Sequence, residues 1–404
     1  MSADGDPAGG HSFGGTSKRP ATRDRFPRTP VALSSRPNVR IGLDATPLLR
    51  PRTGIGVFTD MLVLHARESG DEVVGLVSGY KRWSDGRPDL GLEVHENWVP
   101  RAMNPVFFDL LRWPKLEDFL GRIDMFIATN YLLPPARRAA AVAYIHDVGR
   151  LTHPELYGRR QVWRARILVR RCARNADLLV VPTEAVAREV AALGLVPRER
   201  MHVVPLAARG LPDPGDTEVA GVPRDAPFLL CVGSLERRKN IPFLLRAFGI
   251  ASSQLPHHLV LAGGGGSARE EAIVAASANG AANRIHFLGS ADERQLGALY
   301  RRADLTLCPS LYEGFGLPVL EAMSCGCPVL ATDIAAHREV GGEAVRLTPI
   351  GDAGAFAESL VDLARDEGAR RHLRSLGIAR SLRFSWSETG RRLREALTRT
   401  PRTR

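Results

Sequence analysis

The sequence predicts an α/β protein with two Rossmann-like, doubly wound domains that face a central cleft. Short apolar runs alternate repeatedly with longer amphipathic stretches, which is typical of strand–helix–strand units in a parallel sheet. The alternation breaks once, at residues 208–225, where Gly, Pro and Asp cluster without periodicity, and then it restarts. The chain has 404 residues, of which 44% are hydrophobic, and this is enough to build two separate cores.

The individual elements follow from this alternation. In the first half we expect strands at residues 40–44, 73–77, 125–128, 141–146, 178–182 and 201–204, and helices at 56–67, 159–175 and 184–193. In the second half we expect strands at 228–232, 259–262, 285–288, 305–308, 328–331 and 344–347, and helices at 241–252, 318–323, 355–365, 369–376 and 385–397. Ligands bind at the carboxyl ends of strands in such sheets, so the residues that follow strands are the candidates for a site.

The domain boundaries follow from composition. Residues 1–38 are rich in Gly, Ser, Pro, Thr and Arg and lack apolar periodicity, so we expect a disordered tail there. We assign residues 39–210 to an N-terminal domain, 211–226 to a linker and 227–380 to a C-terminal domain. Residues 381–404 should form a last helix, which crosses back to the N-terminal domain, and a basic tail.

The charge and the cysteines narrow the class of protein. A net charge of +11 favours phosphate-bearing ligands, anionic lipid or nucleic acid, without choosing among them. No apolar run is long enough to span a bilayer, and the first forty residues lack the apolar core of a secretory signal. The five scattered cysteines fit a reducing compartment, so we expect a cytoplasmic location. We expect Cys325 and Cys327 to be small buried residues, because no partner ligands for a metal lie near them in the sequence.

The segment EGFGLPVLE at residues 313–321 follows the expected strand 305–308 and opens a helix at Pro318. Its glycines allow close approach of the backbone to a ligand, and a helix start suits a phosphate or sugar hydroxyls. Glu313 lies before the helix and Glu321 one turn inside it, so both carboxylates can point into one cleft. Carboxylates beside an apolar, glycine-bearing loop indicate a functional site rather than a solvated surface.

A basic loop, VGSLERRKN at residues 232–240, lies between an expected strand and helix. Arg offers a bidentate fork and Lys a compact charge, so such a pair can hold a diphosphate. Because a helix dipole disfavours cations near its N-terminus, three of them together favour an anion between them, although an ordinary polar loop is the alternative reading. Fixed cations here would stabilise a departing nucleoside diphosphate without a metal.

Together with SLYEGFGLP and EAMSCGCPV around it, this Glu-x7-Glu element resembles family 4 of the GT-B glycosyltransferases, over roughly residues 40–395. The resemblance implies a retaining, metal-independent hexosyltransferase with no cofactor, which uses a nucleoside-diphosphate sugar as co-substrate. It implies that Glu313 and the backbone of Phe315 and Gly316 meet the donor sugar and that Glu321 holds the ribose. It places Arg238 and Lys239 on the pyrophosphate. The donor-side residues that it indicates are Gly54, Gly56, Gly233, Arg238, Lys239, Phe315, Gly316, Leu317 and Glu321.

The N-terminal half should complete the site. His146 and Asp147 end an expected strand, and the resemblance places His146 near the donor sugar, where it orients the sugar and is not a general base. In the implied front-face mechanism, the departing phosphate oxygen takes the acceptor proton. Asp147 either caps a helix or orients His146. Asn130 lies in a segment that lines the acceptor side in the family, and Gly54 to Gly56 form a glycine loop where an Arg-Tyr pair is common but Val57-Phe58 stands here.

The expected helix at residues 159–175 carries seven arginines within an arc of about 160°. Trp163 and Ile167 fall inside this arc, which suits either an anionic membrane surface or a solvated face with two stray apolar side chains. A lipid-linked acceptor would make a peripheral position on the inner face of the plasma membrane sensible. For Phe107, Phe108 and Trp113, packing in the core is the expected use.

The function that we expect is transfer of a hexose, with mannose favoured, to a saccharide or lipid-linked acceptor in polysaccharide biosynthesis. The alternatives are another nucleotide-sugar enzyme, such as an epimerase, a dinucleotide oxidoreductase, or a basic non-catalytic binding protein. A dehydrogenase should show Gly-x-Gly-x-x-Gly after its first strand, and residues 53–58 lack the third glycine. We do not expect nucleic acid as a partner, because no known nucleic-acid module is evident and aromatic residues make up only 6%.

Overall fold

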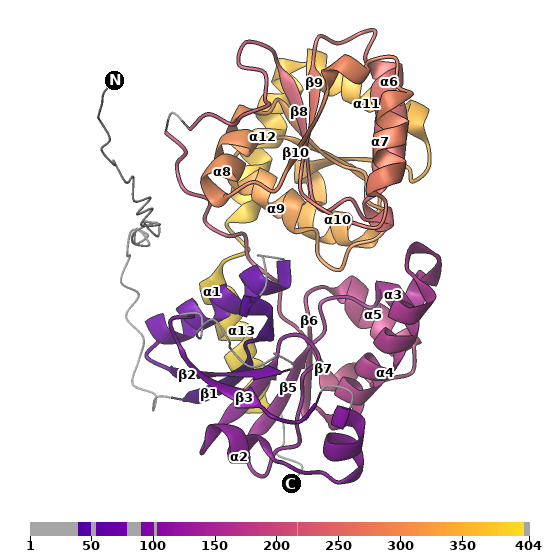
Figure 1. The fold of residues 1–404 in the computed structure, drawn as a ribbon. Coiled ribbons are helices and arrows are strands. Elements are labelled where there is room, and N and C mark those ends of the chain that lie inside the picture. The colour runs from indigo at the N-terminus through magenta and orange to yellow at the C-terminus, as the bar shows by residue number, and fades with distance from the viewer. Residues whose placement is uncertain (1–38, 50–53, 79–89, 101–102, 216, 400–404) are drawn as a thin grey trace, which may run out of the picture. The chain divides into compact units, whose positions relative to one another are not determined.

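The computed structural model describes residues 39–49, 54–78, 90–100, 103–215 and 217–399. The tail expected at residues 1–38 and the basic end at 400–404 lie outside these residues, as does Thr53 of the glycine loop. Within the described chain, two parallel sheets carry the fold (Figure 1). None of the helices that the structure describes is long and apolar enough to cross a membrane.

The first sheet has seven strands in the order β3-β2-β1-β4-β5-β6-β7. These are β1 (Arg40–Asp44), β2 (Glu72–Ser78), β3 (Glu93–Asn97), β4 (Met125–Ala128), β5 (Ala140–Tyr144), β6 (Leu178–Val181) and β7 (Met201–Val203). All neighbouring pairs are parallel. The order reverses between β1 and β4, which is where doubly wound sheets bind ligands.

The second sheet repeats this plan with six strands in the order β10-β9-β8-β11-β12-β13. They are β8 (Phe228–Val232), β9 (His258–Ala262), β10 (Ile285–Gly289), β11 (Leu305–Cys308), β12 (Val329–Thr332) and β13 (Val345–Thr348). These pairs are parallel too, and the order reverses between β8 and β11. The predicted pair of doubly wound sheets is therefore confirmed.

Helices connect the strands in both halves. In the first half they are α1 (Gly54–Glu68), α2 (Leu116–Leu120), α3 (Gly149–Thr152), α4 (Arg159–Asn175) and α5 (Glu184–Ala192), with a short π-helical segment η3 (Pro105–Leu110). In the second half they are α6 (Ile241–Ala251), α7 (Arg269–Ser277), α8 (Glu293–Arg302), α9 (Leu317–Ser324), α10 (Ala335–Gly341), α11 (Ala353–Arg365), α12 (Glu367–Ser381) and α13 (Trp386–Arg399).

Buried parallel strands place alternate side chains on opposite faces of the sheet. In β8, Leu229 and Cys231 join the apolar cluster that includes α6 and α11, whereas Phe228 and Leu230 join the cluster on the other face. Helices α6 and α11 pack on one another, as do α9 and α12. Both faces of the second sheet are thus covered, and its strand ends are left for the site.

The last helix, α13, packs on α1 of the first half (Figure 1). Trp386 donates a hydrogen bond from Nε1 to the carbonyl oxygen of Ala208 (3.1 Å), and Thr389 donates to that of Pro205 (2.8 Å). Arg394 pairs with Asp71 at 2.6 Å. The chain therefore returns to the first sheet after completing the second; the exact domain boundaries stay a prediction.

Candidate donor-sugar site

The site residues gather where the strand order of the second sheet reverses. A pocket there is lined by the ends of β8 and β11, by the loops that follow them, and by Lys239, Glu313 and His337. Gly233 follows β8 with φ of 147°, a conformation that L side chains rarely adopt. A Cβ on Gly233 would lie 3.1 Å from Cε of Lys239, so the glycine leaves room for the lysine stem.

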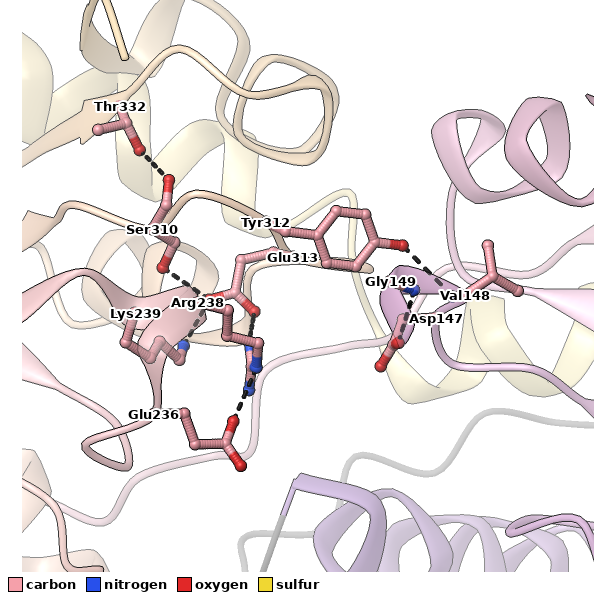
Figure 2. A network of polar contacts seen from close by, with 10 residues as sticks. All are labelled: Asp147, Val148, Gly149, Glu236, Arg238, Lys239, Ser310, Tyr312, Glu313 and Thr332. Carbon is pink, nitrogen blue, oxygen red and sulfur yellow. Dashed lines mark hydrogen bonds and ion pairs between the residues drawn. The ribbon is translucent and has the colours of Figure 1, made fainter. Parts of the chain in front are cut away.

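Glu313 holds the two predicted cations together (Figure 2). Its Oε2 lies 2.5 Å from Nη1 of Arg238, and its Oε1 lies 2.5 Å from Nζ of Lys239. The Ser310 hydroxyl donates a further hydrogen bond to Oε1 (2.8 Å). The carboxylate side chain is only 10% exposed, so these charged groups meet in a largely desolvated place.

The local fold explains why these three side chains meet. Arg238 and Lys239 end the short 3₁₀ turn η6 (Arg237–Lys239), and Asn240 then adopts the left-handed conformation that turns the chain into α6. The carbonyl oxygen of Arg238 accepts a hydrogen bond from the backbone N–H of Leu311 (2.8 Å). This bond ties the basic loop to the loop that carries Glu313.

The ion pairs of the cluster shift the pKa values of Glu313 and Arg238 in opposite directions. Burial alone would raise the pKa of the Glu313 carboxyl, but Arg238 and Lys239 outweigh it and hold the pKa well below its usual range. Burial lowers the pKa of Arg238, and Glu313 and Glu236 more than compensate, so its pKa is raised. Glu236 accepts a hydrogen bond from Nε of Arg238 at 2.8 Å. Glu313 and Arg238 are therefore both ionised near neutral pH.

Helix α9 begins one residue earlier than the predicted Pro318, at Leu317. Gly316 precedes it with φ of 92° and ψ of 48°, and a Cβ on Gly316 would lie 3.3 Å from Cδ2 of the buried His337. Phe315 is buried, with its ring edge-on to Phe384 at 5.8 Å between centroids. Phe315 and Gly316 are both buried, and the contact of their backbone with a donor sugar stays a prediction.

Glu321 does not share the pocket with Glu313, although the sequence suggested one cleft for both carboxylates. Its side chain is buried, with Oε1 2.6 Å from Nε of Arg209 and Oε2 accepting from the hydroxyl of Tyr300 at 3.1 Å. A carboxylate can accept about four hydrogen bonds, so these partners leave capacity for a ribose. The ribose role of Glu321 stays a prediction.

His146 lies two residues beyond β5 and is neutral near pH 7. Burial lowers its pKa to about 4, although a bond to the backbone of Thr129 opposes this. Its Nε2 lies 3.0 Å from the carbonyl oxygen of Thr129, which can only accept, so Nε2 carries the proton and Nδ1 is an acceptor. Its ring centroid lies 5.0 Å from that of Phe58 and 4.7 Å from that of Tyr144.

Asp147 supports the backbone rather than His146. Its Oδ1 accepts a hydrogen bond from the N–H of Gly149 (3.1 Å), but Val148, not Asp147, is the N-cap residue of α3. Asp147 therefore closes the turn that leads into this helix. Asn130 is partly buried two residues beyond β4. Gly54 and Gly56 lie in the first turn of α1, and a Cβ on Gly54 would lie 3.6 Å from Cδ1 of Leu317. The glycine loop and α9 therefore lie side by side.

The sequence did not indicate a set of contacts that join the Glu313 loop to the first half (Figure 2). Tyr312 donates from its hydroxyl to Oε2 of Glu189 on α5 at 2.7 Å and accepts from the N–H of Val148 at 3.3 Å. Thr183 donates to the carbonyl oxygen of Gly314 at 2.9 Å. A Cβ on Gly314 would lie 2.1 Å from the carbonyl oxygen of His146, so only glycine fits there.

A second missed contact lies at the start of α5. Glu339 of α10 accepts from the backbone N–H groups of Glu184 at 2.7 Å and Ala185 at 3.0 Å. N–H groups in the first turn of a helix have no partner within the helix, and the helix dipole favours a carboxylate there. The sequence gives no sign of this contact, because 155 residues separate Glu184 from Glu339.

The site and the two sheets define a glycosyltransferase of the GT-B type. Solved structures support the fold: sucrose-phosphate synthase from Thermosynechococcus elongatus matches with a TM-score of 0.69 at 18% identity, over 89% of this chain and 98% of that one. The "Glycosyl transferase 4-like domain" model matches residues 53–207, and the "Glycosyl transferases group 1" model matches residues 215–380.

Curated relatives agree with these models. The chain is 28% identical to O-antigen chain mannosyltransferase B of Escherichia coli over 67% of its own length and 72% of that protein. It is 34% identical to D-inositol 3-phosphate glycosyltransferase of Thermobispora bispora, spanning 55% of itself and 56% of that protein. The chain belongs to the group 1 glycosyltransferases, family 4, and is a hexosyltransferase, as the sequence predicted.

Proposed function

We propose that this enzyme transfers a mannosyl group from a nucleoside-diphosphate sugar, with retention of configuration, to a saccharide or lipid-linked acceptor in polysaccharide biosynthesis. The carrying observation is the buried cluster of Arg238, Lys239 and Glu313 at the edge where β8 and β11 end. Two fixed cations beside one carboxylate suit a ligand with a diphosphate next to a sugar.

The proposed reaction needs stabilisation of a departing diphosphate. The bond from the anomeric carbon to the phosphate oxygen breaks, and the acceptor oxygen bonds to the same face of that carbon. The departing phosphate oxygen takes the acceptor proton, so no protein base is required. Arg238 and Lys239 would neutralise the charge that grows on the diphosphate, with no metal and no cofactor. Glu313, relieved of part of its ion pairing, would accept hydrogen bonds from sugar hydroxyls.

His146 would orient the sugar from the first half. Its neutral ring offers Nδ1 as a hydrogen-bond acceptor, which suits a sugar hydroxyl. A group with a pKa of about 4 is a weak base near neutral pH, which fits an orienting role. The contact between Gly314 and the backbone of His146 supports a role beside Glu313.

The choice of mannose and of a polysaccharide product draws support from a relative's name. The Escherichia coli relative is named a mannosyltransferase of the O-antigen chain. A lipid-linked acceptor would place the enzyme at the inner face of the plasma membrane, and we propose α4 as its contact. On α4, Trp163 and Ile167 are exposed, and so are Arg159, Arg160, Arg164, Arg166, Arg170 and Arg174. Arg171 departs from the predicted basic face, because it is buried.

A donor screen tests the proposed reaction. Thermal shift with mannosyl, glucosyl and galactosyl donors on GDP, UDP and ADP should select a mannosyl donor, which the enzyme should then hydrolyse slowly in the presence of EDTA. With an acceptor, proton NMR should show the donor's anomeric configuration in the product. Inversion would refute retention, loss of activity in EDTA would refute metal independence, and a glucosyl or galactosyl preference would refute mannose.

A further inference from the structure

An apolar patch lies beside α4 on the first half. Of the fifteen large hydrophobic side chains that are exposed in the described chain, eight belong to residues 98–113 or to α4. They are Trp98, Met103, Val106, Leu110, Leu111 and Trp113, with Trp163 and Ile167 of α4. Leu110 is 76% exposed and Leu111 56%. Such clustering of apolar side chains marks an interaction surface, whereas single ones do not.

The six side chains of residues 98–113 form what we call the apolar ledge. The rings of Trp98 and Trp113 lie 5.2 Å apart between centroids, and Trp98 also meets Phe107 at 6.2 Å. Beneath them Phe108 is fully buried, as expected from the sequence, but Trp113 is half exposed, so the prediction of core packing was wrong for Trp113. The ledge is therefore a built surface over a packed base.

An ion pair fixes the ledge to α4. Asp109 of η3 lies 3.0 Å from Nε of Arg171 and accepts a hydrogen bond from Asn175 at 2.9 Å. The guanidinium of Arg171 also lies over the ring of Phe108, at 5.2 Å from its centroid. These contacts hold η3 against the last turns of α4.

Helical spacing extends the ledge along α4. Residues four apart lie on one face of a helix, so Ile167 and Trp163 continue the stripe that Arg171 and Asn175 begin. The side chains that touch η3 and the two exposed apolar side chains of α4 therefore lie in one row. Exposed arginines flank this row on α4.

The charge of this surface selects the partner. The described residues of 98–113 and α4 together contain eight arginines and a single acidic residue, Asp109, which is already paired with Arg171. Tryptophans prefer the boundary between lipid headgroups and hydrocarbon, and leucines penetrate deeper. Arginines beside them favour anionic headgroups over an apolar protein surface.

We propose that the apolar ledge inserts into the headgroup boundary of an anionic membrane while the arginines of α4 bind its headgroups. The inference extends the membrane contact proposed for α4 and does not depend on the transfer chemistry. It assigns the apolar part of binding chiefly to Leu110 and Leu111, two adjacent aliphatic side chains that are both more than half exposed.

Co-sedimentation with vesicles of phosphatidylcholine alone, or with about 30% phosphatidylglycerol to give an anionic surface, tests this inference. The wild type should bind the anionic vesicles, more weakly in high salt but still measurably. The Leu110→Ser/Leu111→Ser variant should bind roughly tenfold more weakly or worse and lose the salt-resistant part. The matched control is Leu382→Ser on the second half, where the leucine is 77% exposed, and it should bind like the wild type.

The remaining outcomes separate the ledge from its alternatives. The Arg160→Glu/Arg164→Glu/Arg170→Glu variant should no longer prefer anionic vesicles to neutral ones. If its binding is unchanged, the proposed contact between the α4 arginines and the headgroups is refuted, but the insertion of the apolar ledge is not. Wild-type vesicle binding by Leu110→Ser/Leu111→Ser, or no vesicle binding by the wild type, would overturn the ledge. The proposal would also be overturned if light scattering showed a dimer of the wild type that the Leu110→Ser/Leu111→Ser variant does not form, because the ledge would then be a contact between two copies of the chain. Donor hydrolysis in solution should be equal in all variants, which keeps this test apart from that of the donor site.

Discussion

The two sheets share one strand plan but carry different chemistry where their strand order reverses. At the ends of β8 and β11, Arg238, Lys239 and Glu313 meet as a largely buried cluster of charges. In the first sheet, Thr129 follows β4 and donates to the carbonyl oxygen of Asp44, and the neutral His146 follows β5 among aromatic rings. The shared topology supplies two equivalent places for a ligand at the strand ends, and the side chains there differ in charge. Only the second sheet offers the cations that suit the proposed diphosphate.

The largest expected effect comes from removing the negative charge of Glu313, at the ends of β8 and β11 in the second sheet. Glu313→Gln should reduce transfer by roughly 100- to 1000-fold, because the carboxylate that we propose to face the reacting sugar loses its negative charge. The fold should survive, since glutamine keeps the shape of the side chain. Turnover with the donor found in the screen measures the loss, and circular dichroism checks the fold.

The matched control for this variant is Glu236→Gln. Glu236 contacts the same arginine, but it is half exposed and its side chain does not line the pocket. We expect a loss of less than about tenfold for it, because exposed ion pairs contribute little. Transfer by Glu313→Gln at the wild-type rate would refute the assignment of Glu313.

Removing either cation should have the next largest effect. Arg238→Ala and Lys239→Ala should each weaken nucleoside-diphosphate binding by about ten- to a hundredfold, the worth of one or two charge-assisted hydrogen bonds. Isothermal calorimetry measures this directly. Arg237→Ala is the control, because that side chain points to the exposed Glu271 and should leave affinity unchanged. Unchanged affinity in both cation variants would end the diphosphate role.

A smaller effect should follow from disturbing the contact between the two edges. Gly314→Ala places a Cβ where the carbonyl oxygen of His146 lies, so the loop must shift. We expect kcat/KM to fall by roughly tenfold, as expected for a misplaced catalytic group, while nucleoside-diphosphate affinity changes little. Gly158→Ala is the control, since a Cβ there meets nothing within 4 Å. Equal kcat/KM in the two variants would contradict the positioning role.

The smallest effect near neutral pH concerns the proton on His146. An unfolded chain binds this proton near pH 6.5, but the folded chain resists it down to about pH 4. The contribution of the neutral His146 to the free energy of unfolding is therefore complete above pH 6.5 and is lost as the pH falls towards 4. Between pH 7.5 and 5 the wild type should lose about 2 kcal/mol more unfolding free energy than His146→Gln. Parallel losses in urea denaturation would mean that His146 is not a buried neutral ring.

Most of the fold was predictable because buried parallel strands carry continuous apolar runs. β1, β4, β8 and β11 have the predicted bounds, and so does α4. β3 was missed because its sequence, EVHEN, belongs to an edge strand in which the only fully apolar residue is Val94 and two glutamates are exposed. α8 was not predicted, although Asp292 and Gln295 form a capping box at its start, which is a signal that the sequence carries.

The residues of the charged cluster could be predicted from local motifs, whereas the contacts that support the cluster could not. Arg238, Lys239 and Glu313 lie in local motifs that follow strands, and the structure brings them together. Arg209, Glu189 and Glu339 reach their partners across 112 to 155 residues, and no local pattern announces such contacts. The exposure of Trp113 was also missed, because apolar character alone does not say which side chains find room in a core.

We propose that the donor diphosphate replaces Glu313 as the ion-pair partner of Arg238 and Lys239. Calorimetry of Glu313→Gln with a nucleoside diphosphate, and with the corresponding nucleoside, tests this most directly. If Glu313 competes with the diphosphate, the variant should bind the diphosphate at least as tightly as the wild type and the nucleoside equally well. Loss of diphosphate affinity on the scale expected for Arg238→Ala would contradict the account, because Glu313 would then be needed to build the anion site.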